Sequence, residues 1–306
     1  MIRRYICYHD KPVHLNKLLF LRPNLLMTDV LIPENHNRNV VNMTYVYPVV
    51  SRRAGGVSIG INLNVNSACN WRCIYCQVPN LTRGGPQPVD LNLLETELDK
   101  MLQDVTSGNF MAEYVDEHDR KLQDIAFSGN GEPTSAPEFL SALKIVEKLL
   151  SKYDLLGKIK VRLITNGSQM DKLNVREAVK FLAHLNGEVW FKLDGGREED
   201  IARINDVSIK VASHLKRLRA CAALCPTYVQ TCMFGLQGLA PDEAQVGAYT
   251  EALLSVKDVI KGVYLYGYAR PSYQPEAPTI SRLPLKVLEQ IAAPLRAQGV
   301  LVNVSY

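Results

Sequence analysis

The residues most able to do chemistry are three cysteines within eight positions, Cys69, Cys73 and Cys76. Their thiolates, separated by three and then two residues, could bind one metal centre from a single loop. A closed structural zinc site takes four ligands, and the nearest histidines in the sequence are the distant His36 and His118. Iron–sulfur clusters also usually take four cysteines, so three would leave one iron open to a small molecule. The clustering favours this open site over a zinc site completed by a distant ligand and over buried, unreactive thiols.

Three polar segments rich in glycine each follow a predicted strand: Ser128-Gly-Asn-Gly-Glu-Pro133, Thr165-Asn-Gly167 and Lys192-Leu-Asp-Gly-Gly196. Glycine allows the main chain to approach a ligand closely, although a simple turn at a strand end would use the same residues. Lys192 and Asp194 are two positions apart, so on a strand they face the same side. We expect that side to be the interior of the fold, because Val189, Phe191 and Leu193 supply an apolar opposite face.

The elements that must position these residues alternate between β-rich runs and amphipathic stretches. The predicted strands are 57–65, 122–128, 160–165, 188–193, 227–234 and 262–268, with 300–304 as a possible edge strand. The predicted helices are 91–103, 137–152, 175–185, 208–221, 242–257 and 284–298. Strands that alternate with helices predict an α/β fold with a mostly parallel sheet. Six units are too few for an eight-fold barrel, so we expect a partial (β/α)6 barrel with a curved six-stranded sheet.

The first part of the chain does not follow this alternation. Residues 1–56 contain scattered prolines and the polar run 34–39, which predicts an irregular N-terminal extension packed on a domain formed by residues 57–306. In barrel-like sheets the chemistry lies at the C-terminal ends of the strands. The three glycine-containing segments and the cysteines should therefore meet at one end of the sheet.

Length and composition limit the class of protein. The chain has 306 residues, of which 47% are hydrophobic and 22% charged, and these values are ordinary for a globular protein. It contains no uninterrupted apolar run near the length of a membrane span, so a cytoplasmic protein with no membrane partner is predicted. A net charge of +4 is a small excess, and binding of nucleic acid is therefore possible but not favoured. Seven cysteines in a reducing compartment do not suggest a disulfide framework.

These motifs resemble the radical S-adenosylmethionine (SAM) superfamily. Its signature is C-x3-C-x2-C with an aromatic residue before the third cysteine, and Tyr75 occupies that position. The resemblance implies that Cys69, Cys73 and Cys76 bind a [4Fe–4S] cluster and that the second strand end contacts the amino group of SAM. The residues that it implicates in binding the cofactor are Tyr75, Gly129, Asn130, Gly131, Glu132, Thr165, Asn166 and Asp194.

The resemblance also implies a reaction and a partner. An electron from a flavodoxin- or ferredoxin-like donor would cleave SAM reductively to a 5′-deoxyadenosyl radical, which would abstract hydrogen from an unidentified substrate. Lys192 and Asp194 are the candidate catalytic residues, with Asp194 accepting hydrogen bonds from the SAM ribose and Lys192 serving the substrate. After the fifth strand, Gly235-Leu-Gln-Gly238 resembles the loop that shelters adenine in such proteins.

Among the branches of this superfamily, the wyosine-base tRNA synthases are the most similar in their motifs. Those synthases carry a second cluster on an N-terminal cysteine triad, whereas here only Cys7 precedes Cys69. A tRNA-modifying enzyme of that type therefore remains an alternative, as does a non-catalytic iron–sulfur or RNA-binding module.

Two further groups of residues allow more than one interpretation. Cys221, Cys225 and Cys232 could hold an auxiliary cluster, but small buried core thiols explain them better. Arg270 follows the sixth strand at the expected barrel mouth, where Arg52, Arg53 and Arg83 could add positive charge. Such arginines would suit a phosphate or carboxylate on the substrate, and solvated loop arginines would look the same.

Overall fold

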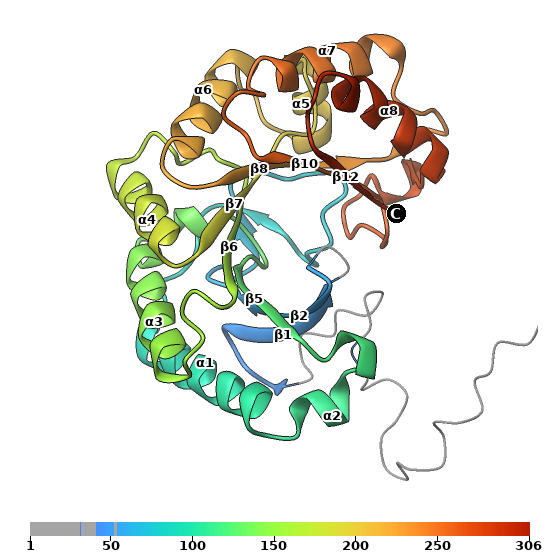
Figure 1. Ribbon diagram of the computed structural model, residues 1–306. Coiled ribbons are helices and arrows are strands. Elements are labelled where there is room, and N and C mark those ends of the chain that lie inside the picture. Colours follow the sequence, from blue (N-terminus) through green and yellow to red (C-terminus); the bar gives the residue numbers. More distant parts are fainter. Residues whose placement is uncertain (1–30, 32–40, 52–53) are drawn as a thin grey trace, which may run out of the picture.

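The protein is a curled sheet of eight strands with helices on its outer face (Figure 1). The structure is a computed structural model, and it describes residues 31, 41–51 and 54–306. The strand order is β1-β2-β5-β6-β7-β8-β10-β12. All neighbouring strands are parallel except β1 and β2, which pair antiparallel. The α/β class and the mostly parallel, curved sheet of a partial barrel are as the sequence predicts.

The strands of the large sheet are β1 (Val46–Ser51), β2 (Gly56–Ile61), β5 (Leu122–Phe127), β6 (Lys160–Thr165), β7 (Gly187–Lys192), β8 (Thr227–Met233), β10 (Gly262–Gly267) and β12 (Val302–Ser305). Two small sheets pair β3 (Ala68–Cys69) with β4 (Thr82–Arg83), and β9 (Gly235–Leu236) with β11 (Ile280–Ser281). All six predicted strands are present, and β12 confirms the predicted edge strand.

The helices are α1 (Leu91–Thr106), α2 (Phe110–Tyr114), α3 (Phe139–Lys152), α4 (Leu173–His184), α5 (Glu198–Asn205), α6 (Val211–Ala222), α7 (Glu243–Leu254) and α8 (Leu285–Ala297). Short 3-10 turns cover Glu117–Asp119, Pro133–Ser135 and Ala277–Thr279. The sequence predicted six of these helices and missed α2 and α5. Each is eight residues or shorter, and the first turn of α5 is wholly acidic, so neither displays a long apolar stripe.

The prediction of an irregular extension up to residue 56 and of a six-stranded sheet is wrong in one respect. Strand β1 lies inside that segment and pairs with β2 from Val46↔Ile61 to Ser51↔Gly56. Pro48 hid this strand, because proline weakens a strand pattern in sequence, yet an edge strand tolerates it. The carboxylate of Glu97 on α1 fixes the start of β1, since it accepts hydrogen bonds from the backbone amides of Thr44 and Tyr45, each at 2.7 Å.

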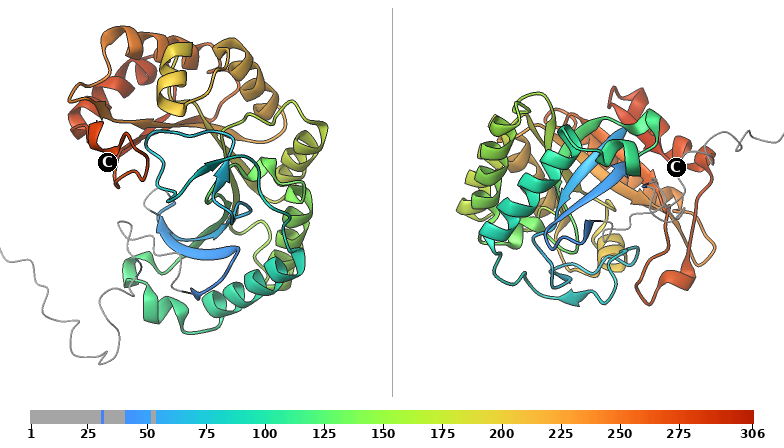
Figure 2. Two further views of the ribbon diagram at one scale, coloured as in Figure 1. Left: turned by 180° about the vertical axis from the view of Figure 1, so that it is seen from behind. Right: turned by 90° about the horizontal axis from the view of Figure 1, so that it is seen from below.

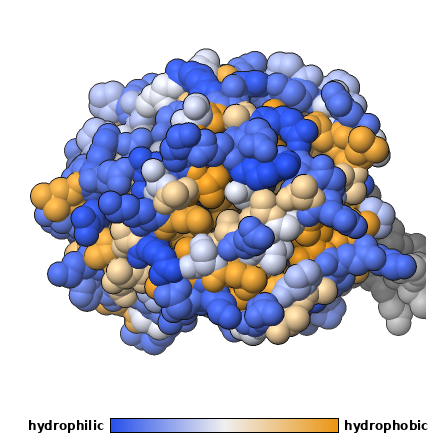
Figure 3. All heavy atoms as spheres, turned by 90° about the horizontal axis from the view of Figure 1, so that it is seen from above, coloured by the Kyte–Doolittle hydropathy of each residue, from blue (hydrophilic) through white to orange (hydrophobic). Residues whose placement is uncertain are grey.

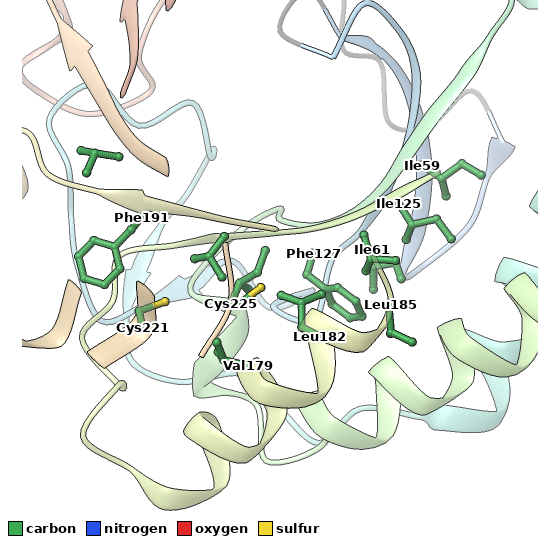
Figure 4. Close-up of a cluster of buried hydrophobic side chains, with 14 of the residues drawn as sticks. Ile59, Ile61, Ile125, Phe127, Val179, Leu182, Leu185, Phe191, Cys221 and Cys225 are labelled. Carbon is green, nitrogen blue, oxygen red and sulfur yellow. The ribbon is translucent and has the colours of Figure 1, made fainter. Parts of the chain in front are cut away.

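The two faces of the sheet differ in what they contact. Ile59, Ile61, Ile125 and Phe127 on β2 and β5 point into the main hydrophobic core, which also contains helix residues such as Leu182 (Figure 4). The residues that alternate with them point to the concave side of the sheet. The core therefore lies between the sheet and the outer helices, and the concave side is left for polar residues.

The outer surface gives no sign of a membrane segment in the part of the chain that the structure describes. None of its helices combines the length and the apolar composition that crossing a bilayer requires. Figure 3 shows one face of the molecule, on which hydrophilic residues predominate and hydrophobic residues form smaller groups between them.

Candidate functional site

The three clustered cysteines lie on a loop that crosses the concave side of the sheet. Cys69 ends β3, and Cys73 and Cys76 follow it without regular secondary structure. In the left view of Figure 2 this segment lies inside the curl of the sheet, and in the right view it lies at one end of the strands. The loop therefore faces the strands rather than the outer helices.

Hydrogen bonds from several directions hold the cysteine loop. The Asn166 side chain, after β6, donates to Asn70 Oδ1 at 2.9 Å. The amide of Ile74 donates to the carbonyl of Ile204 on α5 at 2.8 Å. The hydroxyl of Ser272, after β10, donates to the carbonyl of Ile74 at 2.7 Å. Because these partners come from distant parts of the chain, the loop conformation depends on the complete fold.

An ion cluster closes the outer side of the loop. The Arg72 guanidinium donates to Asp206 at 2.8 Å and, through two nitrogens, to Glu276 at 2.8 and 2.9 Å. Arg83 forms a further ion pair with Asp206 at 2.8 Å. The charges of Arg72 and Arg83 are thus matched by carboxylates. Arg83 does not supply the free positive charge at the barrel mouth that the sequence allowed, and Arg52 and Arg53 lie outside the described residues.

All three cysteines line one cavity of about 270 Å³. The C-terminal ends of β6 and β7 and the residues just after β5 and β6 line it too, through Gly129, Asn130, Gly131, Glu132, Thr165, Asn166 and Lys192. The inward residues Ser58, Asp124, Arg162 and Trp190 form its deeper wall. The strand ends and the cysteines that the sequence singled out are therefore brought together around one space.

A buried ion network stiffens the deep wall of this cavity. Arg162 donates to the carboxylate of Asp124 and, at 2.6 Å, to Oε1 of Glu188. The guanidinium also lies over the Trp190 ring, 5.0 Å from its centroid. The side chains of Asp124 and Glu188 are only 2% and 6% exposed, so both charges depend on Arg162 for compensation.

The strand-end glutamate binds protein groups. Glu132 Oε1 accepts hydrogen bonds from the hydroxyls of Thr134 and Thr165, both at 2.6 Å. Its Oε2 accepts from the amide of Asn166 at 2.6 Å. Burial raises the pKa of this carboxyl above its ordinary value, and these donors partly offset that rise. Glu132 therefore ties the end of β5 to the end of β6.

Two glycines beside Glu132 allow close contacts within the protein. A Cβ on Gly129, whose φ is +130°, would lie 2.5 Å from Oδ1 of Asn62. A Cβ on Gly131 would lie 2.2 Å from the carbonyl oxygen of Ala68. Gly131 is thus required for the approach of the chain to the segment that carries Cys69, and Gly129 is required for its approach to Asn62. The carbonyl oxygens of Gly129 and Gly131 accept no hydrogen bond from a described residue.

Asp194 is the centre of a buried hydrogen-bond network under the cysteine loop. Its carboxylate accepts from the hydroxyl of Tyr75, from Nδ2 of Asn205 at 2.7 Å and from the amide of Cys232 at 3.0 Å. Lys192 donates to the Tyr75 hydroxyl at 2.7 Å, and its Nζ lies 3.9 Å from Oδ2 of Asp194. Lys192 and Asp194 therefore do share a face, as predicted. Lys192 lines the cavity, whereas Asp194 is 3% exposed and does not line it.

Comparison with known proteins identifies the family. Residues 63–246, more than half of the chain, match the family described as "Radical SAM superfamily". The chain belongs to the radical SAM superfamily. Proteins of this superfamily use a [4Fe–4S] cluster and SAM.

Two curated relatives are similar over part of this radical SAM chain. "GTPase Obg" from Brachyspira hyodysenteriae is 27% identical over 149 residues, which are 48% of this chain and 19% of that protein. "UPF0026 protein slr1464" from Synechocystis sp. is 25% identical over 169 residues, which are 54% of each. The chain thus spans about a fifth and about half of the lengths of these relatives.

Two solved structures share the fold. A radical SAM methyltransferase from Sphaerobacter thermophilus superposes with a TM-score of 0.54 at 14% identity, over 85% of this chain and 68% of that one. The histidine-tagged protein anSMEcpe, solved with bound AdoMet, gives a TM-score of 0.50 at 18% identity, over 80% and 63% of the two chains. These similarities confirm the partial barrel.

The surroundings of the cysteines in this radical SAM protein fit an iron–sulfur cluster. Nδ2 of Asn205 lies 3.2 Å from Sγ of Cys73, and the amide of Trp71 lies 3.5 Å from Sγ of Cys69, so both sulfurs accept hydrogen bonds. Hydrogen bonds to sulfur are a means by which proteins tune such clusters. Burial raises the pKa of the Cys69 thiol to about 12 and that of Cys73 to about 11, so a thiolate there needs a positive partner. In the described part of the chain, no three His, Cys, Asp or Glu side chains are arranged closely enough to surround a single metal ion.

The fit to SAM rests on the strand ends. The carbonyls of Gly129 and Gly131 are acceptors at the cavity wall and would suit an ammonium group. A separate cavity of about 190 Å³ adjoins the predicted adenine loop and is lined by Phe234, Leu236 and Gln237, among others. Its lining combines apolar side chains with polar ones such as Gln237 and Gln245, and this combination would suit a flat heterocycle. The roles in binding SAM predicted for Tyr75, Asn130, Glu132, Thr165, Asn166 and Asp194 stay predictions.

The remaining cysteines of this radical SAM protein divide between two environments. Cys221 and Cys225 are buried in the main core, where Figure 4 shows them among apolar side chains. Cys232 belongs to a different cluster, on the concave side with Ile74 and Tyr75. The three therefore do not form an auxiliary cluster site, which agrees with the interpretation as core thiols.

Sequence reasoning missed several residues that position the site. Asn205 contacts both Cys73 and Asp194, and Asn62 accepts the amide of Asn130 at 3.0 Å. His214 contacts the carbonyl of Lys192 at 2.9 Å and packs 5.6 Å from the Trp71 ring. Each is an isolated polar residue, and nothing in the sequence around it indicates a partner that is distant along the chain.

Proposed function

We propose that this protein is an enzyme that binds a [4Fe–4S] cluster through Cys69, Cys73 and Cys76 and binds SAM beside it. When bound, the cluster and SAM would supply one-electron reductive cleavage of SAM, with the electron taken from an external donor, and the radical chemistry that removes hydrogen from a substrate. The observation that carries this proposal is that the three thiols and three consecutive strand ends line a single cavity.

The chain's own residues would hold and orient the reacting groups. Asn205 and the Trp71 amide would donate hydrogen bonds to cluster sulfurs, and the Gly129 and Gly131 carbonyls would accept from the SAM ammonium. Burial opposes the positive charge of Lys192, but the nearby Tyr266, Asp194 and Cys73 outweigh it and raise the pKa of the ammonium. Lys192 would therefore present a cation to the cavity, either to substrate or to cofactor.

For Asp194 the observed contacts support a positioning role in place of the predicted contact with the SAM ribose. Its carboxylate already accepts hydrogen bonds from Tyr75, Asn205 and Cys232, so we propose that it positions the cysteine loop. A positioning residue of this kind acts on the cofactor through Tyr75 and Asn205. The ribose would then be bound by other groups at the strand ends.

The electron would come from a flavodoxin- or ferredoxin-like donor, which we propose as the partner, in a cytoplasmic setting. Nucleic acid is not favoured as a partner, because the net charge is only +4 and the arginines nearest the loop, Arg72 and Arg83, are paired with carboxylates. The tRNA-modifying alternative has no supporting observation at this site.

The test compares cysteine variants after anaerobic reconstitution with iron and sulfide. Wild type should hold about four irons per chain and form 5′-deoxyadenosine when reduced with dithionite in the presence of SAM. Cys73→Ala should lose both, since it removes one of three ligands. Cys221→Ala is the matched control, because Cys221 is also a free thiol but lies buried in the apolar core, and it should retain iron and SAM cleavage.

Two results would contradict the proposal. One is stoichiometric zinc in place of iron, with no charge-transfer absorbance after reconstitution. The other is full iron loading without any reductant-dependent consumption of SAM, which would identify a non-catalytic iron–sulfur module.

A further inference from the structure

A second cavity, of about 230 Å³, adjoins the cysteine cavity at Arg270. Arg270 lines both cavities, and Arg282, Tyr268 and Tyr306 line the second one. Among the described residues that line this second cavity, the charged side chains are the two arginines. A space with this lining would favour an anion with hydrogen-bonding oxygens.

Arg282 differs from the arginines beside the cysteine loop. Arg72 and Arg83 are neutralised by Asp206 and Glu276, whereas Arg282 forms no ion pair with any described residue. One of its guanidinium nitrogens donates to the carbonyl of Ala269, next to Arg270 in sequence. This bond fixes the guanidinium against the segment that follows β10, and its remaining donors are not used by a described residue.

The position of this cavity relates it to the chemistry. Gly267 ends β10 and residues 268–270 follow it, at the same end of the sheet as the segments after β5, β6 and β7. Nε2 of Gln77 donates to the carbonyl of Arg270 at 3.2 Å, so Arg270 is linked to the residue that follows Cys76. The hydroxyl of Tyr268 accepts from the amide of Ser272, which leaves its own proton for a ligand.

We propose that this second cavity binds an oxyanion of the substrate, a phosphate or a carboxylate, through Arg270 and Arg282. The planar guanidinium fork matches the oxygens of either group. A substrate anchored there would extend past Arg270 into the cysteine cavity, where the rest of the molecule would meet the reacting groups. The assignment to substrate rests on the proposed function, while the anion site itself does not.

The test is calorimetric titration of the reconstituted protein with inorganic phosphate and, separately, with acetate at constant ionic strength. Wild type should bind at least one of them, and the tighter ligand identifies the class of oxyanion. Arg270→Gln and Arg282→Gln should each weaken that binding about ten-fold. Arg282→Lys retains a donor for the carbonyl of Ala269 but lacks the planar guanidinium, so it should also weaken anion binding. This variant provides the test if Arg282→Gln folds poorly. Arg219→Gln is the control, because Arg219 pairs with Asp258 and lines neither cavity.

The outcomes separate this inference from the proposed function. Equal phosphate and acetate affinity in wild type and in the Arg270 and Arg282 variants would overturn the subsite, whether or not SAM is cleaved. Loss of anion binding when the protein is saturated with SAM would also overturn it, because the arginines would then serve the cofactor. Anion binding that persists beside SAM, in a protein that does not cleave it, would support the site and contradict only the reaction.

Discussion

The hydroxyl of Tyr75 donates a hydrogen bond to the carboxylate of Asp194, 119 residues away in sequence. Tyr75 lies between two of the clustered cysteines, and Asp194 lies just beyond the end of β7. The tyrosine ring also packs 5.6 Å from Phe234, after β8. The cysteine loop is therefore fastened to two neighbouring strands of the barrel through one aromatic side chain.

Asp194→Asn should destabilise the protein by about 1–3 kcal/mol, because an amide offers one acceptor and one donor to a set of three donors. Chemical unfolding of the reconstituted protein would measure the change, and iron content should fall with it. Molecules of the variant that do retain a cluster should bind SAM with wild-type affinity.

The control for this experiment is Asp258→Asn, whose exposed ion pair with Arg219 should contribute less than about 1 kcal/mol. If Asp194→Asn is as stable as wild type and holds a full complement of iron, but binds SAM about ten-fold more weakly, the carboxylate of Asp194 binds the ribose of SAM instead.

Gly131→Ala should impair both folding and cluster binding. The new Cβ would lie 2.2 Å from the carbonyl of Ala68, so the backbone that leads into Cys69 must shift. We expect a loss of roughly 1–3 kcal/mol in the free energy of unfolding and reduced iron per chain, measured by denaturation and by iron assay. Gly247→Ala on α7 is the control, since nothing lies within 4 Å of its Cβ and alanine should stabilise the helix by about 0.5–1 kcal/mol. Wild-type iron content in Gly131→Ala would show that the strand end can move without disturbing the cysteines.

His214 should make stability depend on pH. Burial lowers the pKa of this imidazole from 6.5 to about 4, so the folded state resists a proton that the unfolded state accepts. Its contribution is complete above about pH 6.5 and is lost as the pH falls towards 4, by about 3 kcal/mol in total.

His214→Gln retains a donor for the carbonyl of Lys192 and should flatten the difference in stability between pH 7 and pH 4.5. Unfolding curves at the two pH values would measure this, with the exposed His184→Gln as control. An unchanged pH slope in His214→Gln would show that carboxylates alone account for the acid sensitivity.

The alternation of strands and helices was readable in the sequence because each strand carries an uninterrupted apolar face, as Val189 and Phe191 do on β7. The helices whose apolar residues recur over about three turns were equally clear in the sequence. Strand β1 was not, because Pro48 interrupts its pattern and only pairing with β2 defines it. The short helix α5 was missed for a related reason, since its stability comes from contacts such as the one between Ile204 and Ile74.

The sequence alone determined which residues have the chemistry: three thiols at close spacing, glycine-rich strand ends, and a lysine and an aspartate on one face of a strand. These residues are close together in the sequence, so their spacing can be recognised without knowledge of the fold. Only the tertiary structure decided how these residues are used. In the folded protein the carboxylates of Glu132 and Asp194 accept hydrogen bonds from other protein groups. Arg83 forms an ion pair with Asp206, and Arg282 and Arg270 line the same cavity. These outcomes depend on contacts between residues that are far apart in the chain. A polar group requires a hydrogen-bond partner once it is buried, and burial exists only after folding.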